Sequence, residues 1–184
     1  MGRIVLVTGG SRSGKSAHAQ KLAEALPGPR TFIATCPVLD DEMRARVLRH
    51  KKDRAGRDWR TVEETADLPG ALRNSKDSNV VLVDCLTLWV NNLMFAAEQE
   101  RTLLVEDEIA ARAQKVLAAC AEIPGAVIFV TNEIGMGIVP DNAQARRFRD
   151  LAGRCNQVIA AGAAAVTLVV SGLPLELKTQ KEPA

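Results

Sequence analysis

Residues 9–16 match the P-loop pattern G-x-x-x-x-G-K-[ST] at every fixed position. In such a loop the glycines let the backbone turn tightly and direct its N–H groups at phosphate oxygens. Lys15 can reach the β- and γ-phosphates, and the Ser16 hydroxyl can bind Mg²⁺. The predicted nucleoside triphosphate site consists of Gly9, Gly10, Ser11, Arg12, Ser13, Gly14, Lys15 and Ser16.

Two more candidates stand at the ends of apolar runs. Asp84 is the last residue of the run 80–84, where a carboxylate can hold Mg²⁺ directly or through water. Ser16 and Asp84 are therefore the two predicted Mg²⁺ ligands. The alternative is an aspartate that begins a turn or caps the next helix. Thr35 follows the run 30–34, and its hydroxyl is expected beside the P-loop unless it is an ordinary strand-end threonine.

Positive charge is concentrated between residues 44 and 60, where eight cations and one histidine fall within seventeen residues. They are Arg44, Arg46, Arg49, His50, Lys51, Lys52, Arg54, Arg57 and Arg60. The segment is either a solvated or nucleic-acid-binding face, or an anion-binding wall that faces the triphosphate. Neighbouring cations favour the neutral imidazole of His50, which can attack phosphorus and carry a phosphoryl or nucleotidyl group.

Three later stretches are also candidates. The acidic pair Glu63 and Glu64 can accept the N–H groups of guanine or can cap a helix. Residues 131–140 place polar side chains, two glycines and a proline after an apolar run, which predicts an active-site loop. The arginines of residues 146–154 either form surface pairs with Asp150 or contact a phosphorylated acceptor or a neighbouring subunit.

Short apolar runs alternate with helical patterns and provide the scaffold for these residues. The runs predict strands at 3–8, 30–34, 80–84, 126–131 and 165–171. Helices are predicted at 15–26, 40–54, 67–73, 87–97, 106–122 and 142–163. This order predicts an α/β fold with a mostly parallel sheet and helices on both faces, and ligands at the carboxyl ends of the strands.

The composition of the 184 residues limits the classes of function. A net charge of +2 and 3% aromatic residues argue against nucleic acid as a partner. The four cysteines are widely spaced, which suggests reduced thiols, and no signal peptide or membrane span is expected, so the location is expected to be cytoplasmic. The expected organisation is one catalytic domain at 1–177 and a frayed tail at 178–184.

With these residues assembled, the chain resembles the bifunctional adenosylcobinamide kinase and adenosylcobinamide-phosphate guanylyltransferase family of cobalamin biosynthesis. The resemblance runs nearly end to end, and its most specific parts are the NEIGMGIVP block at 132–140 and His50. The other matching stretches are 8–16, 32–35, 41–50, 59–63, 82–87 and 148–157.

The resemblance implies a RecA-like P-loop fold, a homotrimer and two reactions. ATP or GTP phosphorylates adenosylcobinamide, and GMP from GTP is then transferred to that phosphate with release of pyrophosphate. The guanylylated histidine falls on His50. The implied nucleotide contacts outside the P-loop are Ile33, Ala34, Thr35, Lys51, Lys52, Asp53, Arg54, Glu63 and Asp84.

Two other functions remain open from the residues alone. One is a small-molecule kinase in which His50 is inert. The other is a nucleotide-switched binding module that uses the basic segment, although no DNA-binding motif is present.

Overall fold

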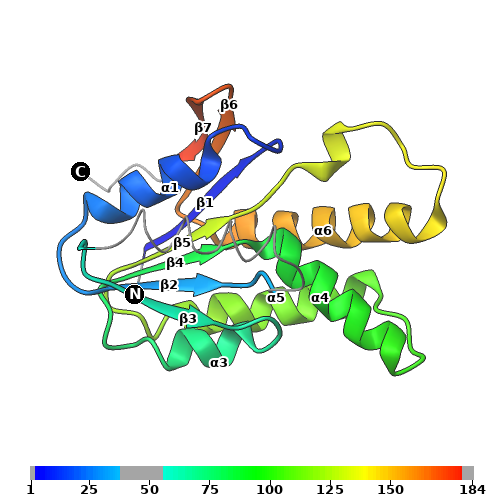
Figure 1. Cartoon of the computed structure of the whole chain (residues 1–184), viewed down its shortest axis with the longest axis horizontal. Coiled ribbons are helices and arrows are strands. Elements are labelled where there is room, and N and C mark those ends of the chain that lie inside the picture. The colour runs from blue at the N-terminus through cyan, green and yellow to red at the C-terminus, as the bar shows by residue number, and fades with distance from the viewer. Residues whose placement is uncertain (1–2, 38–55, 180–184) are drawn as a thin grey trace.

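The computed structural model describes residues 3–37 and 56–179, which form a seven-stranded sheet (Figure 1). The strands are β1 (Arg3–Gly9), β2 (Arg30–Ala34), β3 (Trp59–Glu63), β4 (Val80–Asp84), β5 (Ala126–Val130), β6 (Ala165–Val170) and β7 (Leu173–Thr179). Their order is β3-β2-β4-β5-β1-β6-β7, and only β6 and β7 pair antiparallel in the described residues. The predicted mostly parallel α/β fold is confirmed.

The predicted strands are all present, and the two missed strands lie at the edges of the sheet. Central parallel strands are covered on both faces, so their apolar runs are nearly continuous and easily found. By contrast, β3 has no fully buried residue and most of β7 is exposed. An edge strand therefore lacks the apolar signal that identified the others.

The prediction of a frayed tail from residue 178 is wrong for its first two residues. Strand β7 continues to Thr179 and pairs with β6. Lys178 Nζ also donates to the carbonyl oxygens of Ala160 at 3.0 Å and Ala161 at 2.9 Å, near the end of a helix. A cation suits the negative end of the helix dipole, and these bonds hold the strand in place. Residues 180–184 lie outside the described part of the chain.

The helices agree with the predicted ranges to within a few residues. They are α1 (Lys15–Glu24), α3 (Leu68–Arg73), α4 (Leu86–Gln99), α5 (Glu106–Cys120) and α6 (Ala143–Gly162), with a short 3-10 helix η1 (Ile134–Met136). Asp67 caps α3 by accepting from Gly70 N at 3.0 Å, and Asn142 caps α6 by accepting from Ala145 N at 3.1 Å. The predicted helix at 40–54 lies entirely outside the described ranges.

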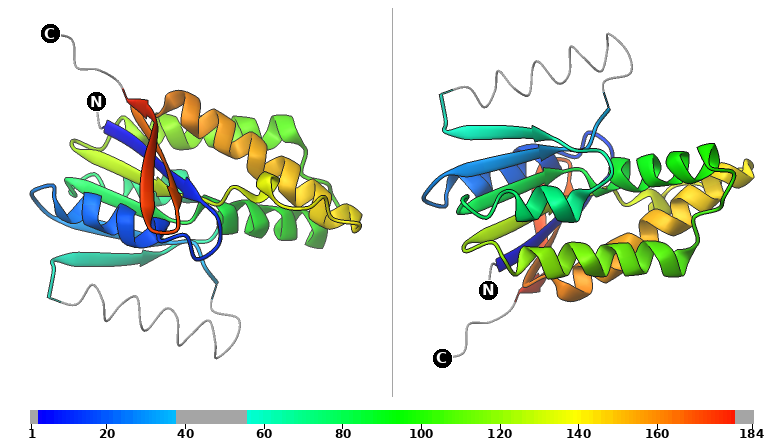
Figure 2. Two further views of the ribbon diagram at one scale, coloured as in Figure 1. Left: turned by 90° about the horizontal axis from the view of Figure 1, so that it is seen from above. Right: turned by 90° about the horizontal axis from the view of Figure 1, so that it is seen from below.

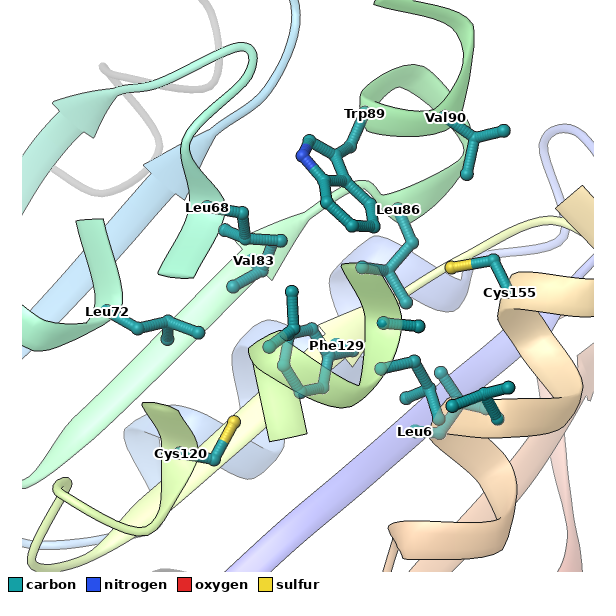
Figure 3. Close-up of a cluster of buried hydrophobic side chains, with 14 of the residues drawn as sticks. Leu6, Leu68, Leu72, Val83, Leu86, Trp89, Val90, Cys120, Phe129 and Cys155 are labelled. Carbon is teal, nitrogen blue, oxygen red and sulfur yellow. The ribbon is translucent and has the colours of Figure 1, made fainter. Parts of the chain in front are cut away.

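Helices cover both faces of the sheet, as predicted (Figure 2). On one face, α1 packs its buried Ala19 and Ala23 against side chains of the strands. On the other face, α3 to α6 enclose a larger core that includes Leu6, Phe129 and Trp89 (Figure 3). Alternate residues of each strand therefore pack into the two cores on opposite faces of the sheet. This alternation determines to which face each strand-end side chain points.

The carboxyl ends of the parallel strands meet at one edge of the sheet. Helix α4 and the segment between β5 and α6 extend beyond this edge (Figure 1). The P-loop and the loops after β2, β4 and β5 are all at this carboxyl edge, so a ligand site is expected there.

Within residues 3–37 and 56–179, none of the helices combines the length and the hydrophobicity needed to span a membrane.

Candidate active site

The P-loop connects β1 to α1 at the carboxyl edge. Gly14 is left-handed, with φ 93°, at the N-cap of α1, and Arg12 has φ 57°. Ser13 N donates to the Gly10 carbonyl at 3.3 Å, and Lys15 Nζ donates to the same carbonyl at 3.2 Å. Gly10 and Gly14 are exposed and Ser16 is half-buried, so the loop is open to a ligand at the helix N-terminus. Such a terminus favours anions through its N–H groups and dipole.

The turn between β6 and β7 braces this loop, a contact that the sequence did not predict. Gly172 N donates to the Ser13 carbonyl at 2.8 Å, and a Cβ on Gly14 would lie 3.3 Å from Gly172 Cα. Ser171 and Gly172 have φ 51° and 83°, which suits a two-residue hairpin turn. A Ser-Gly pair is a turn signal, but without β7 the hairpin was not recognised.

Replacement of Gly9 by alanine is expected to destabilise the fold and abolish nucleotide binding. A Cβ there would meet the Val169 carbonyl oxygen in β6 and lie 2.7 Å from Ser13 Oγ. Because Gly9 pairs with Val169, either the P-loop shifts or the pairing of β1 and β6 opens, at a cost of about 1–3 kcal/mol. Urea unfolding and equilibrium GTP binding measure the two effects.

Gly10→Ala is the matched control for this substitution. A Cβ on Gly10 meets nothing within 4 Å, so its stability is expected to stay within about 0.5 kcal/mol of the wild type. Equal losses of stability in the two variants would contradict the steric argument.

Asp84 ends β4, and β5 separates that strand from the P-loop strand β1. The pKa of the adjacent Cys85 thiol reports on the charged groups near Asp84. Burial raises the pKa of Cys85 to about 12, the Asp84 carboxylate adds to this rise, and the Lys15 ammonium partly offsets it. Lys15 and Asp84 therefore act electrostatically on the same atom, although they are far apart in the sequence. The topology also places Lys15 and Asp84 at the same carboxyl edge of the sheet, and a triphosphate site with Mg²⁺ requires such a lysine and carboxylate.

The side chains of Ile33, Ala34 and Thr35 face the interior of the protein, so the predicted nucleotide contacts at these residues would have to be made by the backbone. Ile33 and Ala34 belong to the two opposite cores. Thr35 Oγ1 donates to the Cys85 carbonyl at 2.7 Å and accepts from Cys85 N at 2.8 Å. Its own N–H donates to the Asp84 carbonyl at 3.2 Å. The Thr35 hydroxyl thus ties β2 to the end of β4 and positions Asp84, since these bonds occupy the hydroxyl that was expected to lie beside the P-loop.

The two members of the acidic pair have different positions. Glu63 is exposed at the end of β3, in register with Ala34, and so lies at the carboxyl edge. Glu64 accepts from Ala66 N at 2.7 Å and Asp67 N at 2.8 Å, just before α3. The Glu64 carboxylate therefore holds the turn that leads to the N-cap residue of α3, and Glu63 remains the candidate for guanine.

The predicted active-site loop after β5 lies against the P-loop. Glu133 N donates to the Gly9 carbonyl at 3.3 Å. Glu133 Oε1 accepts from Thr8 Oγ1 at 2.6 Å and from Asn156 Nδ2 at 3.3 Å. Asn156 Oδ1 in turn accepts from Thr131 Oγ1 at 2.7 Å. Sequence reasoning located the loop but missed Thr8 and Asn156, which hold its carboxylate beside the phosphate site.

Two arginines of α6 hold the outer part of the same loop. Arg146 Nη1 donates to the carbonyls of Pro140 at 2.9 Å and Asp141 at 2.7 Å. Arg149 Nη2 donates to the Gly135 carbonyl at 2.8 Å. These two guanidinium groups satisfy loop carbonyls, a function that neither sequence interpretation of the arginines included.

Most of the basic segment lies outside the described residues. Those predicted residues are Arg44, Arg46, Arg49, His50, Lys51, Lys52, Asp53 and Arg54. Two described members pair with carboxylates: Arg57 with Glu24 at 2.8 Å and Arg60 with Asp77 at 3.2 Å. Because Arg57 and Arg60 lie at the amino end of β3, opposite the P-loop, the predicted anion-binding wall does not include them.

The sheet order, the P-loop and the carboxylate two strands away define the RecA-like class of P-loop nucleotide-binding proteins. A solved structure supports this class for the fold alone: a prototypical ATPase from the type III secretion system of pathogenic bacteria. The TM-score is 0.60 at 9% identity, and the match covers 96% of this chain and 57% of that chain.

The model of the cobinamide kinase / cobinamide phosphate guanyltransferase family matches residues 5–177, and this chain belongs to that family. It is 45% identical to the bifunctional adenosylcobalamin biosynthesis protein CobU of Escherichia coli K12, over 95% of this chain and 99% of that protein. It is 38% identical to the bifunctional adenosylcobalamin biosynthesis protein CobP of Pseudomonas aeruginosa, over 94% of this chain and 96% of that protein. The predicted bifunctional kinase and guanylyltransferase is confirmed at the level of the family.

Proposed function

We propose that this chain catalyses two successive reactions at one nucleotide site. It phosphorylates adenosylcobinamide with ATP or GTP, and it then transfers GMP from GTP to adenosylcobinamide phosphate. The products of the second step are adenosylcobinamide-GDP and pyrophosphate. The observation that carries the proposal is the P-loop at the carboxyl edge of the sheet with Asp84 at the end of β4 on the same edge, in a chain of this family.

The kinase reaction is supported by the charges and donors around the P-loop. Phosphoryl transfer depends on positioning and on neutralising charge on the γ-phosphate. Lys15 supplies a cation, and the N-terminus of α1 supplies N–H donors. Ser13 Oγ is buried and has no hydrogen-bond partner in the described residues, so a polar ligand in the loop can satisfy it.

The residues also suit Mg²⁺, which we propose as the cofactor. Ser16 and Asp84 provide a hydroxyl and a carboxylate, both half-buried, and oxygen donors are what Mg²⁺ prefers. Within the described ranges no group of three or more His, Cys, Asp or Glu could hold a metal ion. Mg²⁺ is therefore expected to take its remaining ligands from phosphates and water, and when bound it neutralises phosphate charge.

The second reaction is assigned to a covalent intermediate on His50, which rests on the family resemblance and the sequence. The imidazole nitrogen forms a bond to the α-phosphorus of GTP, and the bond to pyrophosphate breaks. A phosphate oxygen of adenosylcobinamide phosphate then attacks the same phosphorus and releases the histidine. Residues 51–54 and Glu63 are proposed to contact the guanine nucleotide in this step.

A homotrimer in the cytoplasm completes the proposal. The edge strand β7 supports self-association, because Leu173, Leu175 and Leu177 are 73%, 57% and 58% exposed. An apolar edge strand left in water favours unwanted pairing, so proteins usually cover it. Light scattering on the purified chain measures the number of subunits.

Product analysis tests the two reactions together. With adenosylcobinamide, Mg²⁺ and GTP, the chain is expected to form adenosylcobinamide-GDP and pyrophosphate, whereas ATP alone is expected to give only adenosylcobinamide phosphate. Phosphorylation without any GMP transfer would favour the simple kinase. Salt-sensitive DNA binding without turnover of either nucleotide would favour the binding module.

A further inference from the structure

Glu133 is a carboxylate beside the P-loop that the proposed reactions have not yet used. We propose that it is the general base of the kinase reaction and accepts the proton of the acceptor hydroxyl. This inference rests on the proposed function, since it assigns a residue to its first reaction.

The backbone and side chain of Glu133 both lie against the first residues of the P-loop. Glu133 N donates to the Gly9 carbonyl, and Oε1 accepts from the Thr8 hydroxyl at 2.6 Å. Thr8 comes directly before Gly9 at the end of β1. A carboxylate held in this way is close to where the triphosphate must bind.

A second set of bonds fixes the orientation of this carboxylate. Asn156 Nδ2 donates both to Glu133 Oε1 at 3.3 Å and to the Asn132 carbonyl at 3.1 Å. Thr87 Oγ1 accepts from Asn132 N at 2.8 Å, which connects the loop to α4. Groups from β1, α4 and α6 therefore position Glu133, and such preorganisation is what a catalytic group needs.

The two oxygens of Glu133 are used differently. Both hydrogen bonds end on Oε1, and no hydrogen bond to Oε2 is formed in residues 3–37 and 56–179. The side chain is half-buried, and the loop that follows it is exposed from Gly135 to Val139. Oε2 thus carries no competing hydrogen bond within the described ranges and can take up a proton.

The hydrogen bonds of Glu133 do not by themselves explain why a charged carboxylate stands at this position. A glutamine could also accept the Thr8 and Asn156 bonds, and it would not repel a triphosphate. A carboxylate near phosphates carries a cost in nucleotide binding through like-charge repulsion. A proton acceptor supplies that reason, because an amide cannot take up the proton.

The proposed step transfers one phosphoryl group and one proton. The acceptor oxygen forms a bond to the γ-phosphorus, the bond from that phosphorus to the bridging oxygen breaks, and the nucleoside diphosphate leaves. The hydroxyl proton goes to Oε2 of Glu133. In the second reaction the attacking group is a phosphate oxygen without a proton to remove, so Glu133 is not needed there.

The test is Glu133→Gln in the full chain, assayed separately for each reaction at saturating substrates. The kcat for phosphoryl transfer from ATP to adenosylcobinamide is expected to fall by about 10²- to 10⁴-fold. The KM for ATP and the covalent labelling by α-labelled GTP are expected to stay within about threefold of the wild type.

Three controls separate chemistry from folding. Glu98→Gln makes the same chemical change at a carboxylate of α4 that accepts from Gln144, and it is expected to leave both reactions unchanged. Glu133→Asp keeps the charge on a shorter arm and is expected to recover part of the lost kcat. Thermal unfolding of Glu133→Gln is expected to match that of the wild type.

Several results would overturn the inference. An unchanged kcat would remove Glu133 from the mechanism, while parallel loss of both reactions or a higher Mg²⁺ requirement would make it a nucleotide- or metal-binding residue. A wild-type chain that cannot phosphorylate adenosylcobinamide would overturn the proposed function and this inference with it. An active wild type with an equally active variant would overturn this inference alone.

Discussion

His50→Ala is expected to abolish covalent attachment of GMP to the protein and to leave phosphoryl transfer to adenosylcobinamide within a few-fold of the wild type. The imidazole is the proposed nucleophile, and alanine offers no atom that can attack phosphorus. Removal of a nucleophile costs more than about 10³-fold in rate in enzymes of this kind. The measurement is protein-bound label after incubation with α-labelled GTP, beside a kinase assay with ATP.

His18→Ala is the control, because the chain has 2 histidines. His18 lies within α1, where alanine is the best helix former, so the helix is expected to be retained. Both activities are expected to survive this change. Label that persists in His50→Ala, or that disappears in His18→Ala, would show that the nucleophile has been assigned to the wrong residue.

Lys15→Ala is expected to reduce phosphoryl transfer by about 10³-fold or more. Lys15 is the P-loop cation whose ammonium group influences the same buried thiol as Asp84. Without it the negative charge on the transferring phosphoryl group is not neutralised, and such electrostatic contacts dominate catalysis of this reaction. Steady-state kinetics with ATP and adenosylcobinamide measure the loss, and GMP attachment is expected to fall as well because the same loop holds GTP.

The same helix offers a matched control in Lys21→Ala. Lys21 is exposed in the last turn of α1, away from the loop. Its removal takes away the same charge and the same side chain without changing the phosphate site, so activity close to the wild type is expected. If Lys15→Ala retained full phosphoryl transfer, the P-loop would not be the phosphoryl-donor site.

The sequence was sufficient to predict the parts of the fold that local patterns determine. The buried strands are recognisable in the sequence as apolar runs, and the P-loop directly follows the first of them, β1. These strands are β1, β2, β4, β5 and β6. The edge strands β3 and β7 have no such runs, because only tertiary pairing makes them strands. For the same reason the hairpin turn against Ser13 was missed.

The site shows the same division between local pattern and tertiary contact. Asp84 was predictable from its place at the end of a strand, but the position of Glu133 depends on Thr8, which is 125 residues away in the sequence. Thr35 illustrates a choice that the sequence left open. A strand-end threonine has the same sequence pattern whether its hydroxyl meets a ligand or, as here, the backbone of Cys85, which follows the neighbouring strand β4.

A mass map of the wild-type chain after incubation with GTP and Mg²⁺ tests the guanylylated histidine most directly. We expect the added mass of one GMP on the peptide that carries His50, in a linkage that is labile to acid and stable to alkali. We also expect adenosylcobinamide phosphate to remove this mass as adenosylcobinamide-GDP forms. No adduct, or an adduct on any other residue, would contradict the proposal that one site performs both reactions through a guanylylated histidine.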